Sequence, residues 1–142
     1  GLVQIVQVGV AAGYEAAGRE LPTQPIVELL LAAGWEGRVV MALVSVVFAP
    51  FAEEVFFRGV LLPACVRELG VGPGLAAQAA VFGLIHFVAR PDLLPMAVPL
   101  ALAGWGFGWL RLRTGSLHAA VAAHAVFNGV QVGLLLAGVT PA

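Results

Sequence analysis

Long uncharged runs alternate with short polar connections along this chain of 142 residues. Three runs contain no Asp, Glu, Lys or Arg, and they cover residues 72–89, 93–110 and 117–139. Each run approaches or exceeds the roughly 20 apolar residues that a helix needs to cross a bilayer. The pattern therefore predicts membrane helices over about residues 75–89, 93–110 and 116–139.

The first part of the chain is less uniform. Residues 1–14 are apolar and are predicted to be the end of a membrane helix. Residues 15–38 are more polar and are predicted to be a connection that contains a short amphipathic helix at 26–33. We therefore divide the chain into an N-terminal part, residues 1–38, and a core, residues 39–142.

Residues 39–69 form the longest predicted element. It contains Pro50 and Pro63. Each proline lacks the N–H that an interior helical position donates, so we expect either one to kink or end the helix. The sequence GVGPG at 70–74 is rich in turn-forming residues and predicts the connection to the next helix.

Composition narrows the class of protein. Hydrophobic residues make up 61% of the chain and charged residues 11%, whereas a soluble domain carries about 25% charged residues. The mean hydropathy is +0.99. We predict an all-α protein, a polytopic transmembrane helical bundle of about five to six helical segments. We expect it to be a multi-pass protein of a bacterial or archaeal cell membrane, in contact with membrane lipid.

Charge and cysteine content add two further points. The net charge is −1 without a basic stripe, so we expect no nucleic-acid partner. The single Cys65 excludes an internal disulfide.

Three pairs of glycines match the GxxxG pattern and are interpreted as helix-packing contacts. They are Gly9/Gly13, Gly104/Gly108 and Gly129/Gly133.

The sequence FAEEVFFRGVLL, residues 51–62, places charged side chains in an apolar stretch. Each charge at the centre of a bilayer costs roughly 2.5–3.5 kcal/mol on insertion scales, so a favourable interaction or a function must offset that cost. Glu54 and Arg58 have the i,i+4 spacing with the glutamate first, which predicts a buried ion pair. Glu53 points about 100° away from Glu54 around a helix, so we expect the two carboxylates to serve different neighbours.

Other polar side chains lie deep in the later apolar runs. His86 belongs to one predicted helix, and His124 and Asn128 share one face of the last helix at i,i+4 spacing. Each group needs a polar partner in an apolar environment, and the least costly arrangement is for all of them to face Glu53. We therefore predict one polar site built from three helices.

This set of residues suits amide hydrolysis by activated water. Glu53 has no local counter-charge and is suited to proton transfer, so with His86 it would hold and deprotonate the water. His124 and Asn128 would donate hydrogen bonds to the oxyanion. The Glu54–Arg58 pair would support the helix that carries the base.

A zinc site is the alternative for the same residues. Glu53, His86 and His124 would be the ligands, and Glu54 would then have to leave Arg58 and act as the base. We favour the reaction without a cofactor, because it gives every residue a role, including Asn128. The chain has no HExxH sequence, no GxSxG sequence and only one aspartate, which argues against other protease chemistries.

The three motifs together resemble a known family. Glu53-Glu54-x-x-x-Arg58, Phe82-x-x-x-His86 and His124-x-x-x-Asn128 are similar in order and spacing to those of the CPBP family. Its members are CAAX prenyl endoproteases and bacteriocin-processing or self-immunity (Abi) proteins. The resemblance covers about residues 39–139 and implies an intramembrane endopeptidase. It also implies a membrane-associated peptide or protein substrate, either CAAX-like or a leader peptide.

A function of another class competes with this interpretation. The same polar cluster would serve a non-catalytic membrane protein that binds a peptide, such as an immunity factor. A proton path would need ionisable groups in a file along the bilayer normal, whereas the groups here are predicted to converge at one depth.

Overall fold

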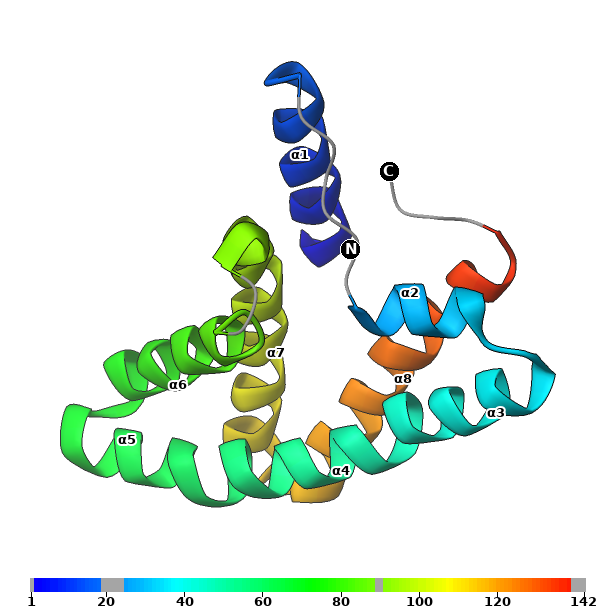
Figure 1. Ribbon diagram of the computed structural model, residues 1–142. Helices are drawn as coiled ribbons and strands as arrows, with labels where there is room; N and C mark the ends of the chain where they lie inside the picture. Colours follow the sequence, from blue (N-terminus) through cyan, green and yellow to red (C-terminus); the bar gives the residue numbers. More distant parts are fainter. Residues whose placement is uncertain (1, 19–24, 89–90, 139–142) are drawn as a thin grey trace.

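The computed structural model describes residues 2–18, 25–88 and 91–138. Within these ranges the regular structure is entirely helical and contains no strand (Figure 1), which confirms the predicted all-α class. The elements outside the long central helix are α1 (Leu2–Ala16), α2 (Pro25–Ala32), α6 (Val71–Ile85), the 3-10 segment η3 (Pro91–Met96), α7 (Ala97–Thr114) and α8 (Leu117–Leu136).

The long central helix is continuous over Trp35–Leu69. Its consecutive segments are α3 (Trp35–Leu43), the π-helical η1 (Val44–Phe48), α4 (Ala49–Glu54), the π-helical η2 (Val55–Leu61) and α5 (Leu62–Leu69). Neither Pro50 nor Pro63 ends the helix, so that alternative was wrong. Each proline follows a π segment closely, and the wider π turn moves the preceding carbonyl away from the proline ring, with which it would clash in a regular α-helix.

The connection after the long helix is much shorter than predicted. Gly70 alone makes the turn, with φ of +84°, and α6 already begins at Val71. Pro73 falls in the first turn of α6, where the N–H groups lack helical partners, so it costs no hydrogen bond. A Cβ on Gly74 would lie 2.7 Å from the backbone of Cys65, so glycine is what permits this tight return.

The ends of the later helices also differ from the prediction. α6 ends at Ile85 and the chain turns through His86, whereas the predicted end, Ala89, lies outside the described residues. The segment η3 precedes α7, which continues to Thr114. Ser116 caps α8 by accepting a hydrogen bond from the Ala119 amide at 3.3 Å. The predicted end at Val139 also lies outside the described residues.

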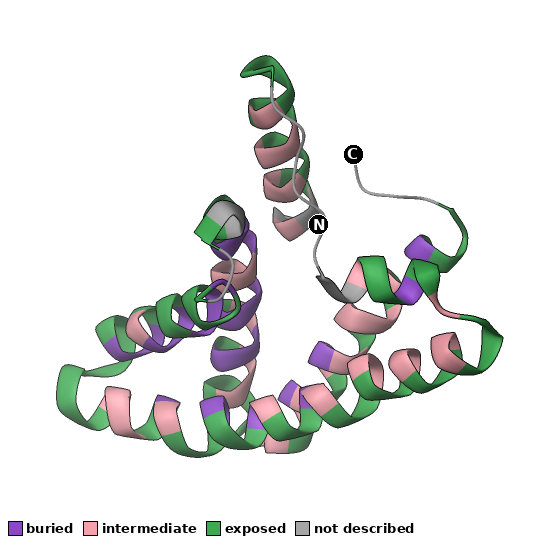
Figure 2. Cartoon of the chain, viewed as in Figure 1, coloured by how far each residue is buried: buried purple, intermediate pink, exposed green. Residues whose placement is uncertain are grey.

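The helices meet around the middle of the long helix, which runs along the base of the view in Figure 1. Many of the buried residues lie on α6, on α7 and near the centre of the long helix, and others lie on α8 and α2 (Figure 2). A Cβ on Gly83 would clash with the Ala97 carbonyl, and one on Gly104 would lie 2.8 Å from the Phe82 ring. These glycines allow α6 and α7 to approach closely.

The outer surface of the long helix is apolar and exposed. Its exposed side chains include Val47, Phe48, Phe51, Phe56 and Val60. By length and composition, Trp35–Leu69 and Leu117–Leu136 could each cross a membrane, and Val71–Ile85 is a shorter apolar helix. A bundle with further crossings stays a prediction.

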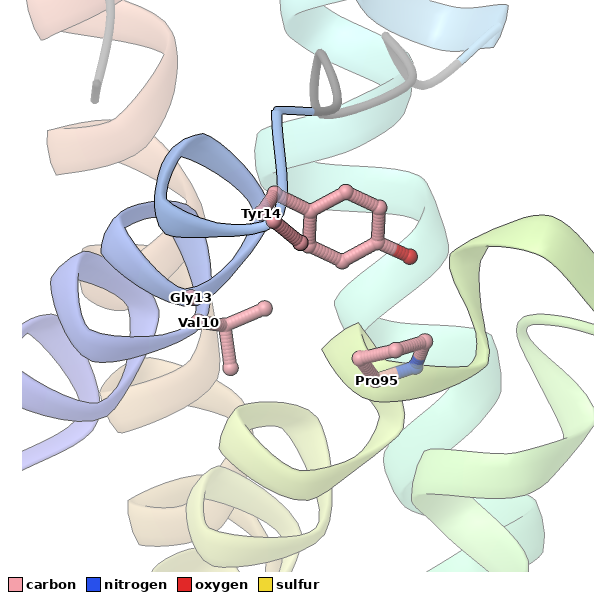
Figure 3. A pocket seen from close by; sticks show the side chains of 5 residues that line it. Val10, Gly13, Tyr14 and Pro95 are labelled. Atoms are coloured by element: carbon pink, nitrogen blue, oxygen red, sulfur yellow. The ribbon is translucent and has the colours of Figure 1, made fainter.

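One cavity of about 350 Å³ lies between α1 and η3. Its lining residues are Val10, Gly13, Tyr14, Ala17 and Pro95 (Figure 3). None of these residues belongs to the predicted polar site.

Candidate active site

Glu54 and Arg58 form the predicted ion pair at the centre of the long helix. Arg58 Nη1 donates to Glu54 Oε1 at 2.8 Å, and both side chains are completely buried. The second guanidinium nitrogen, Nη2, donates to the Gly104 carbonyl on α7 at 2.8 Å. Because two of its nitrogens are bonded to different helices, Arg58 ties η2 to α7 at the level of the site.

Three phenylalanines surround the Arg58 guanidinium. Its central carbon lies 4.5 Å from the Phe82 ring centroid, 5.3 Å from that of Phe107 and 5.7 Å from that of Phe57. A cation held against aromatic faces is stabilised electrostatically, and more so when water is excluded. The aromatic side chains therefore help to offset the cost of burying this charge.

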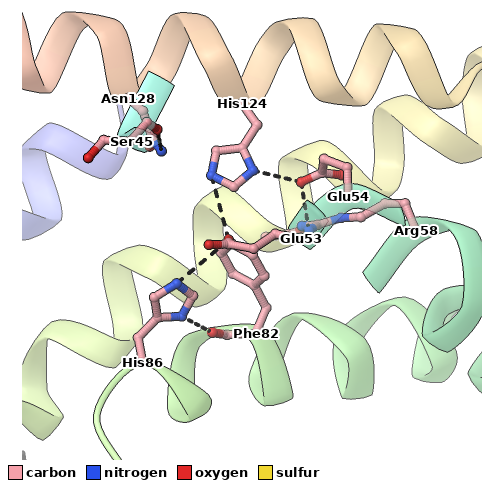
Figure 4. Close-up of polar contacts among 9 residues, drawn as sticks. Ser45, Glu53, Glu54, Arg58, Phe82, His86, His124 and Asn128 are labelled. Carbon is pink, nitrogen blue, oxygen red and sulfur yellow. Dashed lines mark hydrogen bonds and ion pairs between the residues drawn. The ribbon is translucent and has the colours of Figure 1, made fainter. Parts of the chain in front are cut away.

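His124 reaches the same ion pair from α8. Its Nδ1 lies 2.8 Å from Glu54 Oε1, so Glu54 accepts from both Arg58 and His124 (Figure 4). The imidazole stacks on Phe107, with ring centroids 4.7 Å apart and an interplanar angle of 17°. Since a carboxylate and an aromatic face both constrain the ring, the direction of Nε2 is fixed.

Glu53 lies between the two histidines. Its Oε2 is 3.8 Å from His86 Nε2 and 3.9 Å from His124 Nε2, and Figure 4 shows the carboxylate directed at both rings. These separations are within ion-pair range but exceed hydrogen-bond length. The prediction that the two glutamates have different neighbours was therefore wrong in one respect, because both approach His124.

His86 follows the last residue of α6. Its Nδ1 lies 2.6 Å from the Phe82 carbonyl, one turn earlier, and its ring packs against the Phe82 ring at a centroid distance of 4.9 Å. A carbonyl oxygen can only accept, so Nδ1 carries the proton and Nε2 of the neutral ring has a free lone pair. The same reasoning gives His124 a protonated Nδ1, because its partner Glu54 is a carboxylate.

Asn128 has a different partner from the other predicted residues. Its Nδ2 donates to the backbone carbonyl of Ser45 in η1 at 2.8 Å. Figure 4 shows this contact beside the cluster rather than within it. Glu53, His86 and His124 are thus brought together, while Asn128 lies one turn beyond His124 and bonds the long helix.

The residues do not fit a zinc site. Nitrogen and oxygen ligands about 2.0–2.1 Å from a tetrahedral zinc lie about 3.3–3.4 Å from one another. The separations of Glu53 Oε2 from the two histidine nitrogens are wider, at 3.8 and 3.9 Å. Within the described part of the chain, no group of three or more His, Cys, Asp or Glu side chains is arranged to hold a metal ion. Glu54, the base in the zinc scheme, is bonded to Arg58 and His124.

Several contacts were not predicted from the sequence. They involve the carbonyls of Gly104 and Ser45 and the rings of Phe57 and Phe107. Backbone carbonyls carry no residue-specific signal, so only the pattern of small residues on α7 could have suggested that Gly104 approaches another helix.

The described residues are helical and bury a glutamate–arginine pair and His124 among apolar helices, with His86 beside them, which is characteristic of a membrane-embedded enzyme. A family model described as Rce1-like type II CAAX prenyl endopeptidase matches residues 35–130. The chain belongs to this family of membrane-embedded proteases, as its motifs predicted. Comparison with curated proteins and with solved structures gave no significant match.

Proposed function

We propose that this protein is an intramembrane endopeptidase that hydrolyses a peptide bond of a membrane-associated CAAX-like or leader-peptide substrate. The observation that carries the proposal is the position of Glu53 Oε2, which is 3.8 and 3.9 Å from the Nε2 atoms of His86 and His124. Glu53 Oε2 and His86 Nε2 are both acceptors when the carboxylate is ionised and His86 is neutral, and His124 Nε2 is a donor when its ring is protonated. A water molecule is a ligand that satisfies such a set.

The spacing suits one water oxygen. Glu53 Oε2 is buried and has no hydrogen-bond partner among the described residues, and a water oxygen about 2.8 Å from it and from His86 Nε2 would supply one. Water would donate its two hydrogens to Glu53 and His86, with its oxygen directed at the substrate carbonyl. Glu53 would take one proton as the C–O bond forms, and would then pass it to the leaving amine nitrogen as the C–N bond breaks.

His124 is suited to stabilise the oxyanion in its protonated form. With Nδ1–H bonded to Glu54, Nε2–H becomes a donor only when the ring is an imidazolium. Glu54 is the counter-charge for that cation and shares it with Arg58. Asn128 uses one of its two amide hydrogens on Ser45, so the second is free to donate to the same oxyanion.

The surroundings suit a substrate that arrives from lipid. Glu53 and His86 are about one-third exposed. Val55, Phe56, Leu84 and Ile85, which neighbour them in the chain, are exposed and apolar. We propose a multi-pass protein of a bacterial or archaeal cell membrane in which residues 39–142 are the catalytic core and residues 1–38 precede it.

Cleavage of a labelled peptide tests the proposal. The purified protein, reconstituted in vesicles, is incubated with lipid-anchored CAAX-type and leader-type peptides and compared with Glu53→Ala. We expect cleavage by the wild type and retained binding without cleavage by the variant. Binding by both proteins without cleavage of any peptide would support the non-catalytic alternative instead.

Chelation tests the role of metal in the same assay. We expect activity to survive dialysis against a zinc chelator, because the geometry does not fit zinc. Stoichiometric zinc in the active protein, with activity lost on chelation and restored by zinc, would overturn the metal-independent mechanism and leave the protease function intact.

A further inference from the structure

Pro50 lies in the interior of the long helix and is fully buried. Just before it, the N–H of Ala49 bonds the carbonyl of Val44, which is the five-residue spacing of a π-helix. If this register continued, the N–H of residue 50 would bond the carbonyl of Ser45. Proline has no N–H, so the Ser45 carbonyl lacks this intrahelical donor.

A side chain from another helix bonds this carbonyl. Asn128 Nδ2 on α8 donates to Ser45 O at 2.8 Å, although the two residues are 83 positions apart. The contact is part-buried, and a carbonyl partly shielded from water and without a partner is costly, so the bond satisfies a need that Pro50 creates. The same bond holds α8 against the helix that carries Glu53 (Figure 4).

The bond acts near the reactive groups. Asn128 follows His124 by one helical turn on the same face of α8, and His124 Nε2 lies 3.9 Å from Glu53 Oε2. A shift of α8 along the long helix would change this separation and the direction of the Asn128 amide together. Fixing Asn128 at Ser45 therefore also fixes the position of His124 relative to Glu53.

We propose that Pro50 is a positioning residue, which keeps the Ser45 carbonyl free so that Asn128 can bond it and align α8 with the catalytic glutamate. The kinetic part of the proposal rests on the proposed protease function, whereas the hydrogen bond does not. In Pro50→Ala, the new N–H would draw the Ser45 carbonyl toward the helix axis and turn it away from Asn128. The Asn128 side chain then loses its acceptor.

A backbone ester provides the matched control. It carries the alanine side chain at position 50 but has an oxygen atom in place of the backbone N–H, so it has the same packing as Pro50→Ala without the competing donor. Pro63→Ala is the second control. It makes the same chemical change after the other π segment, where the N–H of Leu62 bonds the Phe57 carbonyl.

The first readout is hydrogen exchange of the Asn128 side-chain amide, measured by NMR in detergent micelles. We expect slow exchange in the wild type, the ester and Pro63→Ala, and exchange about tenfold faster in Pro50→Ala, as for the loss of one hydrogen bond. Unchanged exchange in Pro50→Ala, or equal acceleration in the ester, would overturn the proposal. This measurement tests the role of Pro50 even if the protein cleaves no peptide. In that case only the proposed protease function fails.

The second readout is peptide cleavage. We expect kcat to fall about tenfold in Pro50→Ala with little change in KM, and to recover in the ester. Combining Pro50→Ala with Asn128→Ala should cause no loss beyond that of Asn128→Ala alone, because both changes break one bond. Additive losses would contradict the coupling.

Folding is followed by thermal melting in detergent. If Pro50→Ala fails to fold while the ester folds, the backbone N–H alone is responsible, as proposed. If both fail, the packing of the proline ring is what matters and the proposal is wrong.

Discussion

Glu53 and Glu54 are adjacent in the sequence but lie in contrasting surroundings. Glu54 is completely buried, and its Oε1 accepts from Arg58 and His124, both at 2.8 Å. The Glu53 side chain is 30% exposed, and its Oε2 lies 3.8 and 3.9 Å from two histidines. One carboxylate is held by short bonds, whereas the other lies near its neighbours without a short bond to either histidine.

The contrast separates structural support from reactivity. Charge-assisted hydrogen bonds of about 2.8 Å are strong and fix the geometry of the groups that share them. A carboxylate bonded in this way is poorly suited to take up a proton during a reaction. Glu53 Oε2 is directed at both histidines and has no hydrogen-bond partner among the described residues, so the proposed mechanism assigns the proton transfer to Glu53 and the support to Glu54.

The largest effect is expected from removing the base. Glu53→Gln keeps the shape of the side chain but cannot accept the proton, so kcat for peptide cleavage should fall by about 10²–10⁴-fold. The melting temperature in detergent should stay close to that of the wild type, because no short hydrogen bond to the histidines is lost. Kinetics and melting of the same preparation check both parts.

Retained activity in Glu53→Gln would show that Glu53 is not the base. A large drop in its melting temperature would instead show that Glu53 also supports the fold, and the contrast with Glu54 would then be lost.

Glu54→Gln should mainly reduce stability. The substitution leaves Arg58 buried without its counter-charge, and breaking a fully buried ion pair costs about 3–5 kcal/mol. The contacts of Arg58 with the Gly104 carbonyl and the phenylalanine rings remain, so we expect the lower part of this range. Chemical or thermal unfolding in detergent measures the loss.

Glu68→Gln is the control for Glu54→Gln. Glu68 pairs with Arg67 at 2.8 Å, but the two side chains are 66% and 77% exposed, and exposed pairs contribute only about 0–1 kcal/mol. Equal losses in the two variants would mean that burial does not set the value of the Glu54 pair.

Local spacing explains which features could be predicted from the sequence. The Glu54–Arg58 pair follows from i,i+4 geometry within one helix, and the apolar runs gave the helices of the core. The contact of Glu54 with His124 joins residues 70 positions apart. Its existence depends on how two helices cross, and side-chain periodicity along one helix does not give that angle.

The predicted packing role of the GxxxG pairs was found for some glycines and not for others, because it also depends on how helices cross. Gly104 and Gly108 do pack closely against α6. A Cβ on Gly9, Gly13 or Gly133 would meet nothing within 4 Å among the described residues, so packing there was not found. The GxxxG spacing marks a face that permits close approach, but a neighbouring helix must also be present. The π segments were missed because they change the register of the hydrogen bonds without changing the apolar pattern.

The smallest effect is expected at Gly104, whose carbonyl accepts from Arg58. A Cβ there would lie 2.8 Å from Phe82 Cδ1, and the ring must move because its Cβ is also only 3.1 Å away. Overpacking of this kind costs about 1–3 kcal/mol, and the better helix propensity of alanine returns up to about 1 kcal/mol. We expect Gly104→Ala to lose about 1–2 kcal/mol of unfolding free energy as the net of these terms.

Gly106→Ala isolates the propensity term on the same helix. A Cβ at Gly106 meets nothing within 4 Å among the described residues, so this variant should be as stable as the wild type or up to about 1 kcal/mol more stable. Gly104→Ala should also lower kcat, because Phe82 contacts both Arg58 and His86, whereas Gly106→Ala should not. The two variants could instead unfold at the same denaturant concentration and cleave peptide equally. The contact between α7 and Phe82 would then not help to hold the Glu54–Arg58 pair in place. The rigidity of Glu54 would then have to come from its bonds to Arg58 and His124 alone.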